Sequence, residues 1–356
     1  MRIKLLYLLF PLLLAVISCK SSSEPETSQD SFQWESLPGN NTGLNDTLLN
    51  DGYRSADLLN YVNGILIVRD GKICAEKYFN DYTKSSYQTI RSVSKSFLSA
   101  LIGIAVNKGM LNLETKFVDL FPEYNNVSDF RFKNITLRHL LTMQGGIRGD
   151  DEFYMTFYLS SNWINTIANR ELLFSPGTSR FYSTAGTHLI SAMLTKASGM
   201  STREFAERYL LEPMGITVKD WARDPQGIYF GGNDMYFTLR DIALLGVLYL
   251  SNGSLGDRQI VPADWVNSSI VYNSSSSSAW GSLSSIGYGF LWWSGNIAGH
   301  RAFFALGHGG QYVLCIPEHN IVIATIADPY GDWDTADMQE RQINGIIADY
   351  IIPAIK

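Results

Sequence analysis

The sequence has few cysteines, few charged residues and no long apolar run beyond its first residues. Of its 356 residues, 3 are cysteines and 17% are charged, and the formal net charge is -6. This charge balance lacks the excess of basic residues that nucleic-acid binding requires, so no nucleic-acid partner is expected. Zinc-type Cys/His spacings, an HExxH helix and a phosphate-binding loop are also missing, so neither a metal nor an organic cofactor is expected. What remains is a globular composition, 46% hydrophobic, long enough for one large domain or two.

The first residues have the pattern of an export signal. A basic start precedes the apolar residues 5–17, a run too short to span a bilayer comfortably. The run ends in Val16-Ile17-Ser18-Cys19, which resembles a bacterial lipobox. Residues 1–18 are therefore interpreted as a lipoprotein signal peptide, with an ordinary signal peptide as the alternative. In the first interpretation a lipid on Cys19 anchors the exported protein to a membrane, facing the periplasm or the cell exterior.

The segment behind this anchor is polar. Residues 19–50 are rich in Ser, Glu, Asp, Asn and Thr, and we expect them to form a flexible tether. No other apolar stretch is long enough to cross a bilayer, so membrane contact is expected through the lipid alone. With Cys19 assigned to the lipid, Cys74 and Cys315 remain. Export permits a disulfide between them, but both lie in predicted strands, so two buried free thiols are favoured.

Strands are predicted at both ends of the remaining chain, with helices between them. Asp70-Gly71 is the tip of a predicted β-hairpin, and short apolar segments after residue 285 predict further strands. The economical architecture is α+β: an antiparallel five-stranded sheet, built from residues 51–110 and 285–356 and flanked by helices. Residues 111–284 form an inserted all-helical domain, whose Ser-rich segment 273–285 is an expected exposed loop. A cleft is expected where the two regions meet.

Ser92 and Lys95 are the strongest catalytic candidates, because they lie one turn apart on one face of a predicted apolar helix. A serine hydroxyl becomes a useful nucleophile only when a base removes its proton. A partly desolvated lysine at a helix N-terminus can do this without a histidine. The alternative is a helix N-cap serine followed by a solvated lysine. Catalysis gains support because a lysine in a buried helix is costly unless it is paired or functional.

Two later segments carry further candidates. Tyr182 lies in a loop immediately before a predicted helix, and a phenol beside Lys95 can act as a base. The run Leu306-Gly307-His308-Gly309-Gly310-Gln311 lies between two predicted strands. Glycines there allow the close backbone approach that an oxyanion hole requires. The alternatives are a packing tyrosine and a plain Gly-rich hairpin turn.

Together these three segments resemble the serine β-lactamase and penicillin-binding-protein superfamily. The resemblance is to its class C-like branch, which includes esterases and 6-aminohexanoate-dimer hydrolase. Ser92-Val93-Ser94-Lys95 resembles the first motif of that branch, and Tyr182-Ser183-Thr184 resembles its Tyr-x-Asn motif. His308-Gly309-Gly310 resembles its Lys-Thr-Gly motif in the His-x-Gly form. The resemblance runs from about residue 55 to the C-terminus and implies the β-lactamase/transpeptidase-like fold.

The resemblance also implies roles for these residues. Ser92 would be the acylated nucleophile, and Lys95 and Tyr182 would share the general acid and base work, in an order left open. The backbone N–H groups of Ser92 and Gln311 would form the oxyanion hole. Substrate binding would fall to the segments that hold the second and third motifs, at Thr184, His308, Gly309 and Gly310. The family requires no cofactor.

Two positions depart from the lactamase pattern. Thr184 stands where the lactamases carry Asn, and a hydroxyl offers different hydrogen bonds from a carboxamide. His308 stands where they carry a Lys that holds the substrate carboxylate, and an unperturbed histidine is mostly neutral at pH 7. Both departures favour a neutral ester or small amide, cleaved through an acyl-serine intermediate. The alternatives are a D,D-peptidase or weak β-lactamase acting near peptidoglycan, and a non-catalytic binding or sensor protein.

Overall fold

The computed structural model of this chain describes residues 32–37, 42–270, 274–275 and 279–356. The predicted signal peptide and Cys19 lie outside the described residues, so the predicted lipid anchor stays a prediction. Of the Ser-rich segment 273–285, predicted as an exposed loop, residues 273 and 276–278 also lie outside them, and residues 283–285 belong to a strand instead of a loop. Within the described ranges, no helix has both the length and the apolar character needed to cross a membrane.

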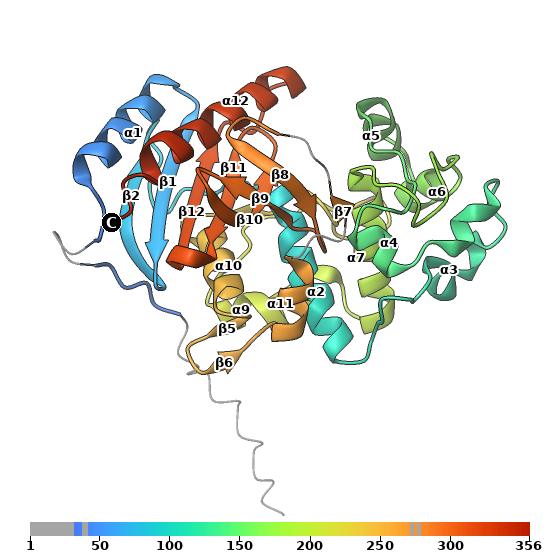
Figure 1. The fold of residues 1–356 in the computed structure, drawn as a ribbon. Helices are drawn as coiled ribbons and strands as arrows, with labels where there is room; N and C mark the ends of the chain where they lie inside the picture. The colour runs from blue at the N-terminus through green and yellow to red at the C-terminus, as the bar shows by residue number, and fades with distance from the viewer. Residues whose placement is uncertain (1–31, 38–41, 271–273, 276–278) are drawn as a thin grey trace, which may run out of the picture. The chain divides into compact units, whose positions relative to one another are not determined.

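Within the described residues, the centre of the fold is an antiparallel sheet of eight strands (Figure 1). In spatial order these are β2 (Lys72–Tyr78), β1 (Val62–Arg69), β12 (Ile321–Ala327), β11 (Gln311–Ile316), β10 (His300–Gly307), β9 (Trp293–Ile297), β8 (Leu283–Tyr288) and the two-residue β7 (Ser274–Ser275). The predicted α+β class is confirmed, but five strands was too few. Residues 286–293, predicted as one strand, turn back where the Gly289 N–H donates to Trp292 O, and so divide between β8 and β9.

Alternating side chains of the sheet supply two cores. In β1, Ile65 and Ile67 face a core shared with α1 (Asp46–Leu58) and α12 (Trp333–Ile346). Leu66 and Val68 face the other core, shared with α10 (Leu239–Leu250) and α2 (Ser94–Asn107). This alternation follows from the two-residue period of a strand, and burial on both faces explains why β1 is apolar almost throughout. Cys74 and Cys315 are buried free thiols, one on each core, as predicted.

The domain boundaries differ from those drawn from the sequence. Helix α1 begins inside the predicted tether, where the Asn45 side chain caps it by accepting from the Thr47 N–H at 3.0 Å. Helix α10, assigned to the helical insertion, packs directly on the sheet. A Cβ at Gly246 of α10 would lie 2.7 Å from Val322 and 2.8 Å from Val313, so glycine permits this contact. Residues 32–356 consequently form one compact unit.

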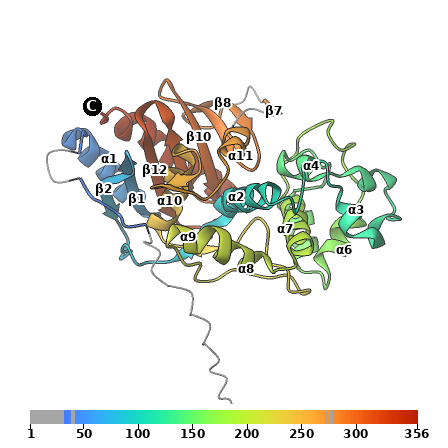
Figure 2. The ribbon, with the colours of Figure 1, turned by 90° about the horizontal axis from the view of Figure 1, so that it is seen from below.

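The fold contains further helices, of which α3, α4, α6 and α7 lie on the side of α2 away from β1 and β2 (Figure 2). They are α3 (Phe117–Leu120), α4 (Leu137–Leu141), α5 (Asp151–Tyr158), α6 (Trp163–Ala168), α7 (Thr184–Ser198), α8 (Thr202–Ala206), α9 (Glu212–Met214) and α11 (Ala263–Ser269). Two short antiparallel pairs complete the fold: β3 (Gln88–Thr89) with β4 (Tyr236–Phe237), and β5 (Ser254–Leu255) with β6 (Arg258–Gln259).

Candidate active site

Ser92 lies in a 3₁₀ turn, Arg91–Val93, that leads directly into α2. The preceding Arg91 has φ +48, a left-handed conformation that is strained for a side-chain-bearing residue. The Arg91 side chain holds this geometry, because its Nε donates to Pro329 O at 2.9 Å. Strand β10 approaches the same turn closely: a Cβ at Gly307 would lie 2.5 Å from Ile90 O. Gly307 therefore provides the close backbone approach that the sequence predicted for this Gly-rich run.

Lys95 lies one turn further along α2 and is only 1% exposed. Its Nζ donates to Ser92 Oγ at 2.8 Å, to Gly232 O at 2.7 Å and to Thr184 Oγ1 at 3.1 Å. These three acceptors match the three N–H donors of an ammonium group. The alternative of a solvated lysine behind an N-cap serine is excluded, since Lys95 is buried against Ser92.

Burial lowers the pKa of Lys95 to about 7, because the ammonium form loses its hydration, and the nearby Asp234 carboxylate opposes this shift. At neutral pH a substantial fraction of Lys95 is therefore an uncharged amine. An amine 2.8 Å from a hydroxyl oxygen can accept the hydroxyl proton directly.

Tyr182 comes from the loop before α7, as predicted. The next residue, Ser183, caps that helix by accepting from the Gly186 N–H at 3.1 Å. The Tyr182 ring is stacked on Trp293, with centroids 5.8 Å apart, and its centroid lies 5.0 Å from Lys95 Nζ. Burial raises the pKa of Tyr182, and a hydrogen bond with the Ser92 side chain partly opposes that shift. The phenol is thus protonated at neutral pH and faces the serine.

The third predicted segment divides into residues that reach the site and residues that do not. Leu306 and His308 line the cavity around Ser92, whereas Gly309, Gly310 and Gln311 are not among its lining residues. His308 Nε2 donates to Gly331 O at 2.7 Å, and the ring lies edge-on to Trp333.

The predicted roles of Gly309, Gly310 and Gln311 at the substrate therefore stay predictions. Positive φ angles of +83 and +101 at the two glycines make the turn between β10 and β11. A Cβ on Gly309 would lie 2.3 Å from Asp328 O, and a Cβ on Gly310 would lie 2.3 Å from the Ile343 side chain of α12. Gln311 is fully buried, and its amide donates to Ala327 O at 3.0 Å. The oxyanion role assigned to the backbone N–H of Gln311 stays a prediction.

Ser92 opens into a cavity of about 430 Å³, a size typical of small-molecule sites. Thr184 also lines the cavity, so both Tyr182 and Thr184 of the second predicted motif reach it. The walls are strongly aromatic, with Tyr154, Tyr182, Trp280, Trp293 and Trp333 among the lining residues. The site thus combines a serine and a phenol that line a largely apolar cavity with a buried amine beside the serine.

Comparison with known proteins agrees with this arrangement. Residues 63–342 match the Beta-lactamase family. The chain belongs to the Beta-lactamase family. The chain is similar to the 6-aminohexanoate-dimer hydrolase of Paenarthrobacter ureafaciens. The two are 23% identical over 314 residues, which cover 81% of this chain and 77% of the hydrolase.

Two solved structures share the fold of this β-lactamase-family protein. EstCE1, a hydrolase with promiscuous acyltransferase activity, has a TM-score of 0.71 at 17% identity, covering 85% of this chain and 99% of EstCE1. An octameric penicillin-binding protein homologue from Pyrococcus abyssi has a TM-score of 0.64 at 20% identity, covering 86% of this chain and 79% of the homologue. The implied β-lactamase/transpeptidase-like fold is therefore confirmed.

Sequence reasoning missed three groups in the site of this β-lactamase-family protein. The segment Gly231-Gly232-Asn233-Asp234 supplies two of them, the Gly232 O that accepts from Lys95 and the Asp234 carboxylate near Lys95. Its glycine pair was the one available signal, since a Cβ at Gly232 would lie 3.0 Å from Lys95 Nζ.

The third missed group is Glu340 of α12, which lines the cavity although only 6% of it is exposed. Its carboxylate accepts from the Gly309 N–H at 3.0 Å. Burial raises the pKa of Glu340 to about 8, and the Gly309 hydrogen bond opposes that shift. A glutamate on an amphipathic C-terminal helix gives no sequence signal of this burial, because exposed glutamates are common on such helices.

Proposed function

We propose that this protein is a serine hydrolase that cleaves an ester or small amide through an acyl-Ser92 intermediate. The observation that carries the proposal is the 2.8 Å contact between Ser92 Oγ and the buried Lys95 Nζ at the floor of the cavity. Family membership supports hydrolysis as the reaction class. Serine and amine are held on one rigid helical turn, which supplies the alignment that nucleophilic catalysis needs.

In the proposed mechanism the uncharged Lys95 takes the Ser92 proton while Ser92 Oγ attacks the substrate carbonyl carbon. The carbonyl oxygen becomes an oxyanion, stabilised by the Ser92 N–H at the start of α2. A second N–H is expected from the Leu306–His308 segment, because that part of β10 and its turn lines the cavity. The leaving group departs with a proton, and water then attacks the acyl carbon to release the acid and restore Ser92.

The opposite pKa shifts of Lys95 and Tyr182 support a division of labour between them. Burial favours the uncharged form of each group: an amine that can accept a proton and a phenol that can donate one. We assign Lys95 as the base for acylation and Tyr182 as the donor to the leaving group. The two groups are close enough for their titrations to be coupled, so a single measured pKa belongs to the pair.

The cavity supports a neutral substrate with an apolar or aromatic body. Five aromatic side chains line the cavity, and such walls bury ring or alkyl surface well. His308 already donates its Nε2 proton to Gly331 O, so this nitrogen is not available to a substrate carboxylate. This favours an ester or small amide over the carboxylate-bearing substrates of a β-lactamase or D,D-peptidase.

The proposal is tested by trapping the acyl-serine. A fluorophosphonate probe is expected to label the protein once, with the adduct on the peptide that contains Ser92. Ser92→Ala should abolish labelling, whereas the matched control Ser94→Ala should still be labelled, since Ser94 is a buried serine nearby whose Oγ accepts from the Met235 N–H. Mass spectrometry of the digested protein locates the adduct. Labelling that persists in Ser92→Ala would contradict the proposal, and rapid nitrocefin hydrolysis would favour a β-lactamase instead.

We also propose that the chain is an exported lipoprotein, anchored through Cys19 and facing the periplasm or cell exterior. The support is the lipobox-like sequence Val16-Ile17-Ser18-Cys19 behind a basic and apolar start. Cys19→Ser should move the protein from the membrane fraction to the soluble fraction, or leave the uncleaved precursor. Cys74→Ser is the control, because Cys74 is a buried thiol of the fold and should not change fractionation. Unchanged membrane association in Cys19→Ser would contradict the anchor.

A further inference from the structure

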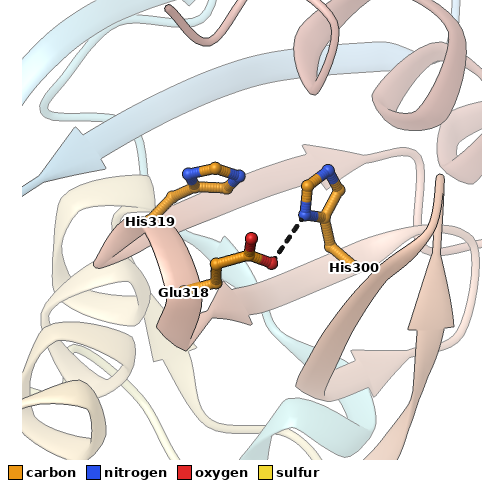
Figure 3. A group of neighbouring side chains, drawn as sticks. All are labelled: His300, Glu318 and His319. Atoms are coloured by element: carbon orange, nitrogen blue, oxygen red, sulfur yellow. Dashed lines mark hydrogen bonds and ion pairs between the residues drawn. The ribbon is translucent and has the colours of Figure 1, made fainter.

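We propose that His300, Glu318 and His319 bind a divalent transition-metal ion of the Zn²⁺ class. The three side chains lie close together, with the His300 ring and the Glu318 carboxylate pointing toward each other (Figure 3). One ligand atom from each residue lies within 4.8 Å of the others. This site is independent of the proposed hydrolase activity.

The geometry of the group suits chelation after small side-chain movements. His300 Nδ1 and Glu318 Oε2 are 2.9 Å apart, and the two imidazole rings lie with their centroids at 4.7 Å. Ligand atoms around a tetrahedral Zn²⁺ are about 3.3 Å apart, given Zn–N and Zn–O distances near 2 Å. The His300–Glu318 pair, at 2.9 Å, is somewhat closer than this spacing, so both this pair and the His319 ring must adjust slightly to bind the ion.

The donor chemistry selects the class of ion. Two imidazole nitrogens and one carboxylate oxygen are ligands that Zn²⁺ and similar ions prefer, whereas Ca²⁺ and Mg²⁺ prefer oxygen ligands alone. Three protein ligands leave a fourth position for water.

The backbone holds the three residues in place. His300 begins β10 and pairs with Ile297 of β9. Glu318 and His319 lie in a 3₁₀ turn that starts at Pro317 and ends at Asn320, whose φ is +50. The antiparallel pairing of β10 with β11 brings this turn beside His300. The His300 side chain is 26% exposed and the Glu318 side chain is 63% exposed, so an ion can reach both from solvent.

The site is also well separated from the catalytic cavity. His300 is at the start of β10 and Gly307, beside the Ser92 turn, is at its end. At about 3.3 Å per residue, the strand puts roughly 23 Å between them. A metal bound at this distance does not touch the reacting atoms, so its binding can be measured apart from hydrolysis.

The experiment is a calorimetric titration of the chelator-treated full-length protein with ZnCl₂. One Zn²⁺ per chain is expected to bind. His300→Gln, His319→Gln and Glu318→Gln should each weaken this binding by at least about tenfold, because each removes one of three ligands. The control Glu123→Gln, which removes an exposed carboxylate remote from any histidine pair, should bind as the unmodified protein does.

Two outcomes would overturn the proposal: no Zn²⁺ binding by the unmodified protein, or unchanged affinity in both histidine variants. The three substitutions lie at the surface and remove no core packing, so they are expected to fold. Circular dichroism of the metal-free variants checks this. Titration with Co²⁺ adds a direct readout, since ligand-field absorption bands should appear with the unmodified protein and be lost in His319→Gln.

Discussion

Replacing Lys95 with methionine is expected to lower kcat/KM for ester hydrolysis by about 10³-fold, the loss expected for removal of a positioned general base. Methionine has a similar length and suits a buried position, so the loss should not arise from unfolding. Its thioether cannot accept the Ser92 proton. The matched control is Lys108→Met, which replaces the exposed lysine that caps the other end of α2 and should leave kcat/KM nearly unchanged.

The pH dependence of kcat/KM provides a second test of the role of Lys95. Because burial lowers the pKa of Lys95 to about 7, the amine is protonated and inactive below that pH and becomes a base above it. kcat/KM of the unmodified enzyme should therefore rise with pH and level off above about 7. The residual activity of Lys95→Met should lack this acid limb. Initial rates with a p-nitrophenyl ester from pH 5 to 9 measure both effects. A variant with full activity, or with the same acid limb, would contradict the role of Lys95 as base.

At alkaline pH, Glu340→Gln is expected to be more stable than the unmodified protein. The pKa of Glu340 is raised to about 8 in the folded protein and returns to about 4.5 when the chain unfolds. Between these values the folded state binds one more proton than the unfolded state, so stability is lost as pH rises. The unmodified protein should lose on the order of 3 kcal/mol through this residue between pH 5 and pH 8. Glutamine keeps an acceptor for the Gly309 N–H and does not titrate.

Urea unfolding of both proteins at pH 5, 6.5 and 8 measures this difference. Other groups titrate in both proteins, so the comparison isolates residue 340. Asp334→Asn on the same helix is the control, because Asp334 is an exposed carboxylate. Equal stability of Glu340→Gln and the unmodified protein at every pH would show that Glu340 is ionised in the folded state.

Features that depend on neighbours in the chain were predictable. Asp70-Gly71 turns the β1–β2 hairpin because both residues adopt positive φ, at +51 and +74. The capping boxes at Ser201 and Thr238 start α8 and α10 where the sequence indicates. The Ser92–Lys95 contact is predictable for the same reason, since residues three apart on a helical turn must be neighbours.

Features that depend on register and packing were not predictable in the same way. Around the β10–β11 turn, Leu306 and His308 reach the cavity whereas Gln311 does not. Neighbouring residues of a strand face opposite sides, so the register of the strand decides which side chains reach the cavity. The sequence likewise gave no reason to connect His300 with His319, which meet because of one pairing of strands.

The sequence by itself determined the local structures and the residue types at the candidate site: the hairpin at Asp70-Gly71, the helix caps, and a serine and lysine one turn apart. These depend on short-range sterics and hydrogen bonds that a few adjacent residues supply. The tertiary structure alone decided that Lys95 and Glu340 are desolvated and that Tyr182 faces Ser92. Desolvation and long-range proximity arise from segments far apart in the chain, and they shift the pKa values on which the proposed chemistry depends.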